Sequence, residues 1–210
     1  MSPLVASPIY CTIYSLNFIC NIGWIFLWGR EMLVAASYVE WGIVLTNILS
    51  LAILIQNIEQ DDHRLKEDQP KIYWTYIVLV FNGQGTYTAW TIIAGLINFT
   101  VCLQYDDNVD VQTASTLYLS FLLIILIFWT MLDLVFLDEF TRFLVSPYLV
   151  VIWGLGGTIS KKSLDPEVSD LTKSYLNGLI AIASILTALK ILVMIFRQIR
   201  KPFNTTYENK

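Results

Sequence analysis

Charge is the first thing that this sequence lacks. Only 14% of its 210 residues are Asp, Glu, Lys or Arg, whereas soluble domains carry about 25%. Residues 1–29 contain no charged side chain at all. Hydrophobic residues make up 56% of the chain, which is more than a soluble core of this size can bury. The composition excludes a cytosolic enzyme, a disordered protein and a nucleic-acid binder, and it predicts the lipid bilayer as the main partner.

The residue types of catalytic and metal sites are scarce as well. The single histidine, His63, lies in a charged segment without a second ligand at zinc spacing. The cysteines Cys11, Cys20 and Cys102 all lie in apolar segments, which indicates small lipid-phase residues rather than disulfides. No Gly-rich phosphate loop, nucleophile elbow or paired-carboxylate motif occurs. We therefore expect no enzymatic activity, no metal and no required cofactor.

What the chain does contain is a series of long apolar segments. A membrane helix needs about 20 apolar residues, and six candidate spans cover residues 8–28, 32–56, 72–105, 115–137, 143–159 and 174–196. The sequence thus predicts an all-α integral membrane protein, with one helical domain over residues 1–210 and a cytoplasmic tail at 197–210. The third segment would form a helix about 51 Å long. We expect one long helix that tilts, or that kinks at Asn82-Gly83-Gln84-Gly85.

The distribution of basic residues predicts the orientation of these spans. With six spans, eight Lys and Arg residues fall on the side of the two termini and four fall on the opposite side. Because cytoplasmic loops carry the excess of positive charge, both termini are predicted to be cytoplasmic. Which membrane the protein occupies, and whether it forms a homo-oligomer, are left open.

Three charged residues lie inside predicted spans, where an unpaired charge costs a few kcal/mol or more. Glu40 shares a helix face with Asn47 and Ser50, and this polar stripe should point into the bundle. Asp133 is expected near the membrane interface, and Lys190 is expected to extend its amine toward the interface. A sharper alternative is a buried ion pair between Lys190 and either Glu40 or Asp133.

Two other stripes combine amides with aromatic rings. The first is Tyr14, Asn17, Asn21, Trp24 and Trp28; the second is Tyr87, Thr91, Ala94 and Asn98, with Trp90 beside it. Their spacing of three and four residues places each stripe on one helix face. Such faces favour either interhelical packing or a pocket that grips an aromatic ligand. All of these residues except Thr91 are therefore candidate ligand-binding residues.

The same stripes carry a family resemblance. The segment YSLNFICNIGWIFLWG, residues 14–29, resembles the third helix of the TspO/MBR family (tryptophan-rich sensory protein / translocator protein). The segment YTAWTIIAGLINFT, residues 87–100, resembles its fifth helix. The resemblance covers about residues 10–105, without counterparts of the family's first two helices. It implies a small lipophilic ligand such as a porphyrin or sterol between helices, contacted by Asn21, Trp24, Trp90 and Ala94.

Three other functions remain open at this stage. A transporter or channel would use Glu40, Asp133 and Lys190 as relay or coupling charges. A retinal-binding photoreceptor would carry a Schiff base on Lys190. A structural or assembly subunit is also compatible with the sequence.

Overall fold

The computed structural model describes residues 7–162 and 169–200. Within them the secondary structure is entirely helical. The six long helices are α1 (Pro8–Trp28), α2 (Leu33–Asp68), α4 (Asn82–Tyr105), α5 (Val111–Met131), α7 (Ser146–Lys162) and α8 (Asp170–Arg200). Shorter pieces are α3 (Pro70–Thr75), α6 (Asp138–Thr141) and two π-helical turns, η1 (Tyr76–Phe81) and η2 (Leu132–Phe136). The fold is therefore the all-α membrane class that the sequence predicts.

Among the residues that the structure describes, five helical segments are long and apolar enough to cross a membrane. They are Pro8–Trp28, Leu33–Gln60, Pro70–Tyr105, Val111–Phe136 and Asp170–Arg200. The remaining predicted span, residues 143–159, corresponds to α7, which has 17 residues and is about 26 Å long, slightly shorter than the hydrocarbon core of about 30 Å. It packs against α4 and α8 inside the bundle.

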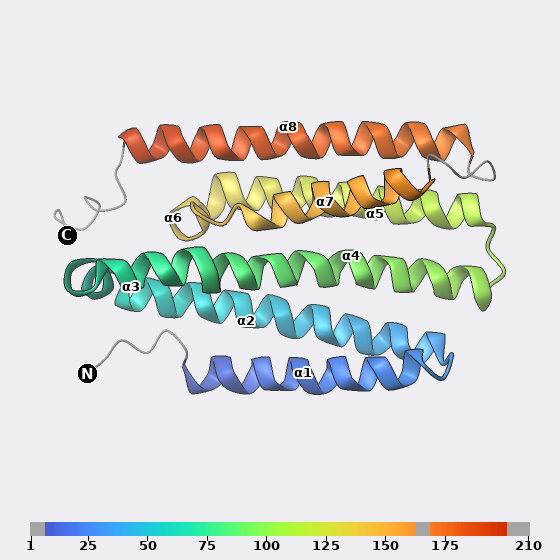
Figure 1. Cartoon of the computed structure of the whole chain (residues 1–210), viewed down its shortest axis with the longest axis horizontal. Helices are drawn as coiled ribbons and strands as arrows, with labels where there is room; N and C mark the ends of the chain where they lie inside the picture. Colours follow the sequence, from blue (N-terminus) through green and yellow to red (C-terminus); the bar gives the residue numbers. More distant parts are fainter. Residues whose placement is uncertain (1–6, 163–168, 201–210) are drawn as a thin grey trace.

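The long helices lie side by side and alternate in direction, so that α1 begins and α8 ends at the same end of the bundle (Figure 1). α4 is central, because it packs against α2, α5 and α7. α1 lies on the outside against α2, and among its residues only Asn17 is buried. The main apolar core fills the space between α4, α5, α7 and α8.

Helix starts follow local sequence signals. Ser7 precedes α1, its hydroxyl accepts a hydrogen bond from the Tyr10 backbone N–H at 3.3 Å, and Pro8 opens the first turn. Asp110 caps α5 by accepting from the Thr113 N–H at 2.9 Å. Hydrogen bonds from Thr113 lower the pKa of the Asp110 carboxyl.

The long third segment is a single helical rod with a local irregularity. α3, η1 and α4 follow one another from Pro70 to Tyr105. The irregularity is the π-helical turn η1, which ends one residue before Asn82. The expectation of one long helix is confirmed, and its irregular turn comes just before the glycines rather than at them. The helix that contains the predicted second span continues beyond residue 56. It extends through the charged residues that follow and ends at Asp68.

Candidate functional site

The stripe on α1 joins that helix to its neighbours through side-chain amides. Asn17 is completely buried, and its Nδ2 donates to the Ile43 carbonyl at 2.9 Å and to Thr46 Oγ1 at 2.8 Å. Its Oδ1 accepts from the Tyr87 hydroxyl on α4 at 3.0 Å. Asn17 thus bonds to both α2 and α4, and it uses every polar atom of its side chain within the protein.

Three further residues of the two predicted stripes, Asn21, Trp24 and Asn98, also form interhelical hydrogen bonds. Asn21 Nδ2 lies 3.4 Å from the Tyr87 hydroxyl, and the Trp24 indole N–H donates to Asn98 Oδ1 at 3.3 Å. Asn98 in turn donates to the Ala94 carbonyl at 3.0 Å. The structure therefore brings α1 and α4 together through the residues that the sequence singled out, and these residues bond to each other.

The aromatic rings at the edges of the α1 stripe contact other rings of α1. Trp28 stacks on Trp24 with 5.5 Å between ring centroids and is 37% exposed. Tyr14 stacks on Tyr10 at 5.5 Å and meets the edge of Phe18 at 4.8 Å. These rings pack along the surface of α1.

The polar stripe on α2 faces inward, as predicted. Glu40, Asn47 and Ser50 are all buried. Asn47 donates to Thr91 Oγ1 and accepts from Gln84 Nε2, both at 3.2 Å, which links α2 to α4. Glu40 lies against α4 where Gly95 leaves room, since a Cβ atom at Gly95 would be 3.8 Å from Glu40 Cγ. We call the hydrogen-bonded network of side chains on α1, α2 and α4 the amide ladder. Its members are Asn17, Asn21, Trp24, Thr46, Asn47, Gln84, Tyr87, Thr91 and Asn98.

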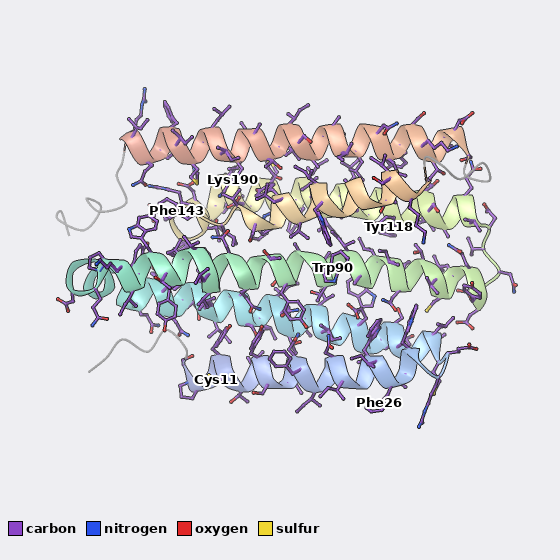
Figure 2. The ribbon with its side chains drawn as sticks, viewed as in Figure 1. Cys11, Phe26, Trp90, Tyr118, Phe143 and Lys190 are labelled. Carbon is purple, nitrogen blue, oxygen red and sulfur yellow. The ribbon has the colours of Figure 1, made fainter. Side chains whose placement is uncertain are left out.

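Trp90 lies on another side of α4. Its ring centroid is 5.4 Å from that of Trp153 on α7, with the ring planes inclined by 54°. Figure 2 shows Trp90 on the α7 side of α4, away from Cys11 and Phe26 of α1. Of the residues predicted to bind a ligand, Trp90 is therefore separated from the α1 stripe, with which it was expected to share a pocket.

Trp90 and Trp153 line a cleft of about 620 Å³ between α4, α5 and α7. We call it the tryptophan cleft. Its other side chains are apolar or carry hydroxyl, amide or amine groups: Ile93, Ile97, Thr100, Val101, Gln104, Ser115, Tyr118, Thr158 and Lys161, with Gly154 and Gly157 on α7. No residue of α1 or α2 belongs to this lining.

A second cavity of about 290 Å³ lies between the same helices and α2. We call it the apolar chamber. Its lining is almost wholly hydrocarbon: Ile48, Leu51, Gly85, Thr88, Ala89, Ile92, Ile93, Leu122, Ile125, Leu126, Phe128, Trp129, Leu132, Pro147 and Val151. Ile93 lines both cavities.

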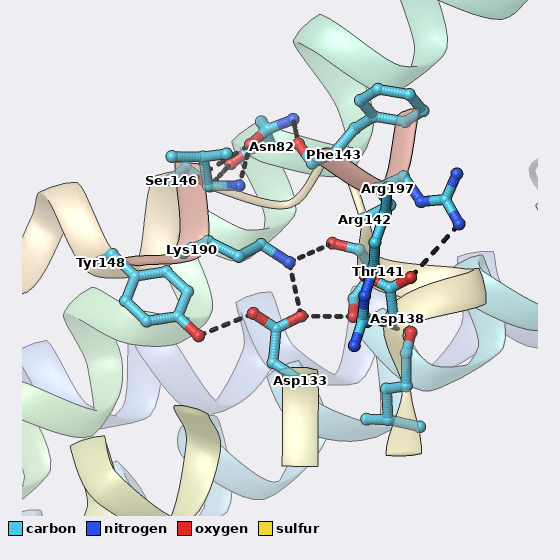
Figure 3. Close-up of polar contacts among 12 residues, drawn as sticks. Asn82, Asp133, Asp138, Thr141, Arg142, Phe143, Ser146, Tyr148, Lys190 and Arg197 are labelled. Atoms are coloured by element: carbon cyan, nitrogen blue, oxygen red, sulfur yellow. Dashed lines mark hydrogen bonds and ion pairs between the residues drawn. The ribbon is translucent and has the colours of Figure 1, made fainter. Parts of the chain in front are cut away.

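The intramembrane charges of the second half form a buried ion pair. Lys190 Nζ lies 2.7 Å from Asp133 Oδ1, and the two side chains are 1% and 0% exposed (Figure 3). The Thr141 hydroxyl donates to the same carboxylate at 2.5 Å, and the Tyr148 hydroxyl donates to its other oxygen at 2.6 Å. Lys190 also donates to the Thr141 carbonyl at 3.0 Å. The pair thus joins η2, α6, α7 and α8.

These contacts show where the two charges point. Asp133 is completely buried inside the bundle, and the Lys190 amine is directed to its carboxylate rather than outward. Each charge is instead satisfied by the other, as buried charges must be. The alternative of a Lys190–Asp133 pair is confirmed, whereas Glu40 lies on α2 against α4 and is not the partner of Lys190.

A second ionic group lies beside this pair, toward the end of the bundle. Asp138 Oδ1 is 2.8 Å from Arg197 Nη1, and Asp138 Oδ2 is 3.2 Å from Arg142 Nη2. Arg142 Nη1 also donates to Gln198 Oε1 at 3.3 Å. Together with Asp133, Lys190, Thr141 and Tyr148, these residues make up the charged cluster, which ties the α6 turn to α8.

Sequence reasoning did not find the contact that places α7. Asn82 Oδ1 accepts from the backbone N–H groups of Val145 and Ser146, each at 3.1 Å, and Asn82 Nδ2 donates to the Phe143 carbonyl at 2.9 Å. The chain passes so close to Gly85 that a Cβ atom there would lie 2.6 Å from Leu144 Cδ1. The signal was present in the Asn82-Gly83-Gln84-Gly85 segment, which marks a docking point for another segment rather than a break.

The architecture, the stripes and the charges can now be compared with known proteins. The family described as TSPO-like protein matches residues 9–197, from the first turn of α1 into the last turns of α8. The chain belongs to the TSPO-like family. No curated protein and no solved structure matches the chain. The TspO-like match extends well beyond residue 105, so α5, α7 and α8, which the two motifs left outside the resemblance, lie within it.

Proposed function

We propose that this TspO-like membrane protein binds a small lipophilic ligand of the porphyrin or sterol type in the tryptophan cleft. The observation that carries the proposal is the facing pair of indole rings, Trp90 and Trp153, on the rim of a cleft of about 620 Å³. Ligand pockets usually have volumes of about 300–1,000 Å³ and combine aromatic walls with a few polar groups. Membership of the TSPO-like family supports the same class of function.

The chemistry of the lining suits such a ligand. The indole faces and Tyr118 offer flat apolar surfaces against which a ring system can pack. Gln104, Ser115 and Thr158 offer hydrogen bonds, and the Lys161 amine can pair with a carboxylate such as a porphyrin propionate. No catalytic step is part of this proposal, since it needs only binding.

The amide ladder has a supporting role in this proposal. Asn17, Asn21 and Trp24 direct their polar atoms to α2 and α4, and none of them lines the cleft. We infer that they fix α4 in position, so that Trp90 on another side of that helix faces α7. They act on the site through α4 and do not touch the ligand.

Tryptophan-fluorescence titration with protoporphyrin, and separately with cholesterol, tests the proposal in the intact protein in micelles. We expect saturable quenching that Trp90→Leu reduces at least several-fold. The matched control is Trp24→Leu, which removes one indole from the ladder and should keep the apparent Kd. Absence of quenching, or an equal Kd in the Trp90→Leu variant, would contradict the proposal.

A transporter is the second candidate, and one observation favours it. Asp133 and Lys190 form an ion pair within two apolar helical segments, and intramembrane charges often mark ion pathways. The test is proton flux into liposomes that contain the protein. Flux that disappears in Asp133→Asn, together with absent porphyrin and sterol binding, would favour transport; absent flux would leave the pair a structural element.

We infer that the end of the bundle where α1 begins and α8 ends faces the cytoplasm. Arg142, which directly follows α6, and Arg197, in the last turn of α8, are paired with Asp138 at this end, whereas Lys161 lies in the last turn of α7 at the opposite end. A glycosylation acceptor inserted between Asp106 and Asp110 should be modified in microsomes. An unmodified acceptor there, with a modified one at the C-terminus, would reverse the orientation.

A further inference from the structure

The two cavities of the C-terminal half lie in line along α4. The apolar chamber contacts α4 from Gly85 to Ile93, and the tryptophan cleft contacts it from Trp90 to Gln104. α5 runs antiparallel to α4, so its earlier residues Ser115 and Tyr118 line the cleft and its later residues, from Leu122 to Trp129, line the chamber. From Gly85 to Gln104 the two cavities together extend along about 28 Å of helix.

Polarity changes sharply from one cavity to the other. The cleft contains Lys161 and Gln104 near its far end, together with hydroxyl groups. In the chamber the hydroxyl of Thr88 is bonded to the Gln84 carbonyl at 2.8 Å. Apart from the indole N–H of Trp129, the side chains around the chamber offer hydrocarbon. A molecule that fills both cavities must therefore be polar at one end and hydrocarbon at the other.

Ile93 occupies the junction between the cavities. Its side chain is buried and lines both of them. On α7, Gly154 lies against it, since a Cβ atom there would be 3.5 Å from Ile93 Cδ1. Because Gly154 has no side chain, a larger residue at position 93 should narrow the space between the two cavities, and a smaller one should widen it.

We propose that the tryptophan cleft also takes an amphiphile with a single long hydrocarbon chain and an anionic head. The head lies in the cleft near Lys161, and the chain passes Ile93 into the apolar chamber. This inference rests on the proposed function, because the head would occupy the same cleft as a porphyrin or sterol. A compact ring without a tail would occupy the cleft and leave the chamber empty.

Brominated palmitate is the probe, because bromine quenches nearby indoles and each cavity has its own tryptophan. Palmitate brominated near the end of its chain should quench Trp129, so that this quenching is reduced in Trp129→Phe. Palmitate brominated near its carboxylate should instead lose quenching in Trp90→Phe. A fatty-acid series from octanoate to stearate should bind more tightly as the chain lengthens, and Lys161→Gln should weaken binding of palmitate but not of palmityl alcohol.

Substitutions at the junction test the path of the chain. Ile93→Phe should close the junction, weaken palmitate binding about tenfold or more and leave octanoate unaffected. Ile124→Phe is the matched control, since Ile124 is 61% exposed on α5 and lines neither cavity. Ile93→Ala widens the junction and should preserve or tighten palmitate binding, which keeps the test decisive if Ile93→Phe folds poorly.

The outcomes separate this inference from the proposed function. Suppose that protoporphyrin quenching depends on Trp90 but that fatty-acid binding is independent of chain length and of residue 93. This result would contradict the proposal that a hydrocarbon chain enters the apolar chamber, and it would still support the proposed function. Failure of protoporphyrin, cholesterol and every fatty acid to bind would overturn both. Displacement of palmitate by lysophosphatidylglycerol, which has one chain and an anionic head, would support the single-chain ligand and identify a membrane lipid as its source.

Discussion

The two halves of this bundle use different chemistry to pair most of their buried polar groups. In α1, α2 and α4 the bonds are neutral: amides, hydroxyls and an indole, with Asn17 bonded to both neighbouring helices. In α5 to α8 they include ion pairs, centred on the Asp133–Lys190 pair at 2.7 Å. Both halves lie within apolar helices, where water is not available to solvate a side chain.

The difference teaches how each half should respond to damage. A neutral interhelical hydrogen bond in a membrane contributes about 0.6–2 kcal/mol. The loss of one bond of the amide ladder should therefore lower the free energy of unfolding only by an amount of this size. Removing one partner of a buried ion pair leaves an uncompensated charge and costs about 3–5 kcal/mol. The ionic half, whose helices α5 and α7 supply part of the lining of both cavities, should therefore be the half that unfolds abruptly.

The largest effect is expected from Asp133→Asn. Lys190 would keep its charge in a buried site without a carboxylate, so the free energy of unfolding should fall by about 3–5 kcal/mol. Thermal unfolding in micelles measures the change. The double variant Asp133→Leu, Lys190→Met removes both charges and should recover most of the loss; equal stability of wild type and Asp133→Asn would contradict the role of the pair.

A smaller effect is expected from Asn17→Leu in the amide ladder. The Tyr87 hydroxyl loses an acceptor and Thr46 loses a donor, so unfolding should become easier by about 2 kcal/mol. The matched control is Phe18→Leu, the next residue of α1, which is 50% exposed and should change stability little. A loss at Asn17 as large as that at Asp133 would erase the contrast between the halves.

The smallest effect is expected where the two halves join, at Gly85. A methyl group there would overlap Leu144, at 2.6 Å from its Cδ1, and Ser146, at 2.9 Å from its Oγ. Because both are side-chain atoms that can move, Gly85→Ala should cost about 1–2 kcal/mol. Gly83→Ala is the matched control: nothing lies within 4 Å of its Cβ position, and it should stabilise the helix by up to about 1 kcal/mol. Equal behaviour of the two variants in thermal unfolding would contradict the close approach of the 143–147 segment.

Much of the fold follows from the sequence because membrane helices obey a simple rule of length and hydropathy. α1 has the predicted bounds, and the third segment is one continuous rod. The inward direction of Asn17 and Asn47 was also predictable, since amides at helical spacing avoid lipid. These features depend on one helix at a time.

The site was less predictable because it depends on which helices become neighbours. Nothing in the spacing of Trp90 tells whether it faces α1 or α7, and the answer is α7. The choice of Asp133 rather than Glu40 as the partner of Lys190 is set by the π-helical turn η2 and the α6 turn, which bring Thr141 and Tyr148 to the same carboxylate. Such turns have no signature in hydropathy.

The most direct test of the central claim is to map where a photoactivatable sterol crosslinks to the intact protein in micelles. If the tryptophan cleft binds the ligand, mass spectrometry should find the label on α4 between Trp90 and Gln104 and on α7 between Trp153 and Lys161. Excess unlabelled cholesterol should abolish that labelling. Competable label on α1, between Tyr14 and Trp28, with none on α7, would contradict the account and return the ligand to the face that the amide ladder occupies.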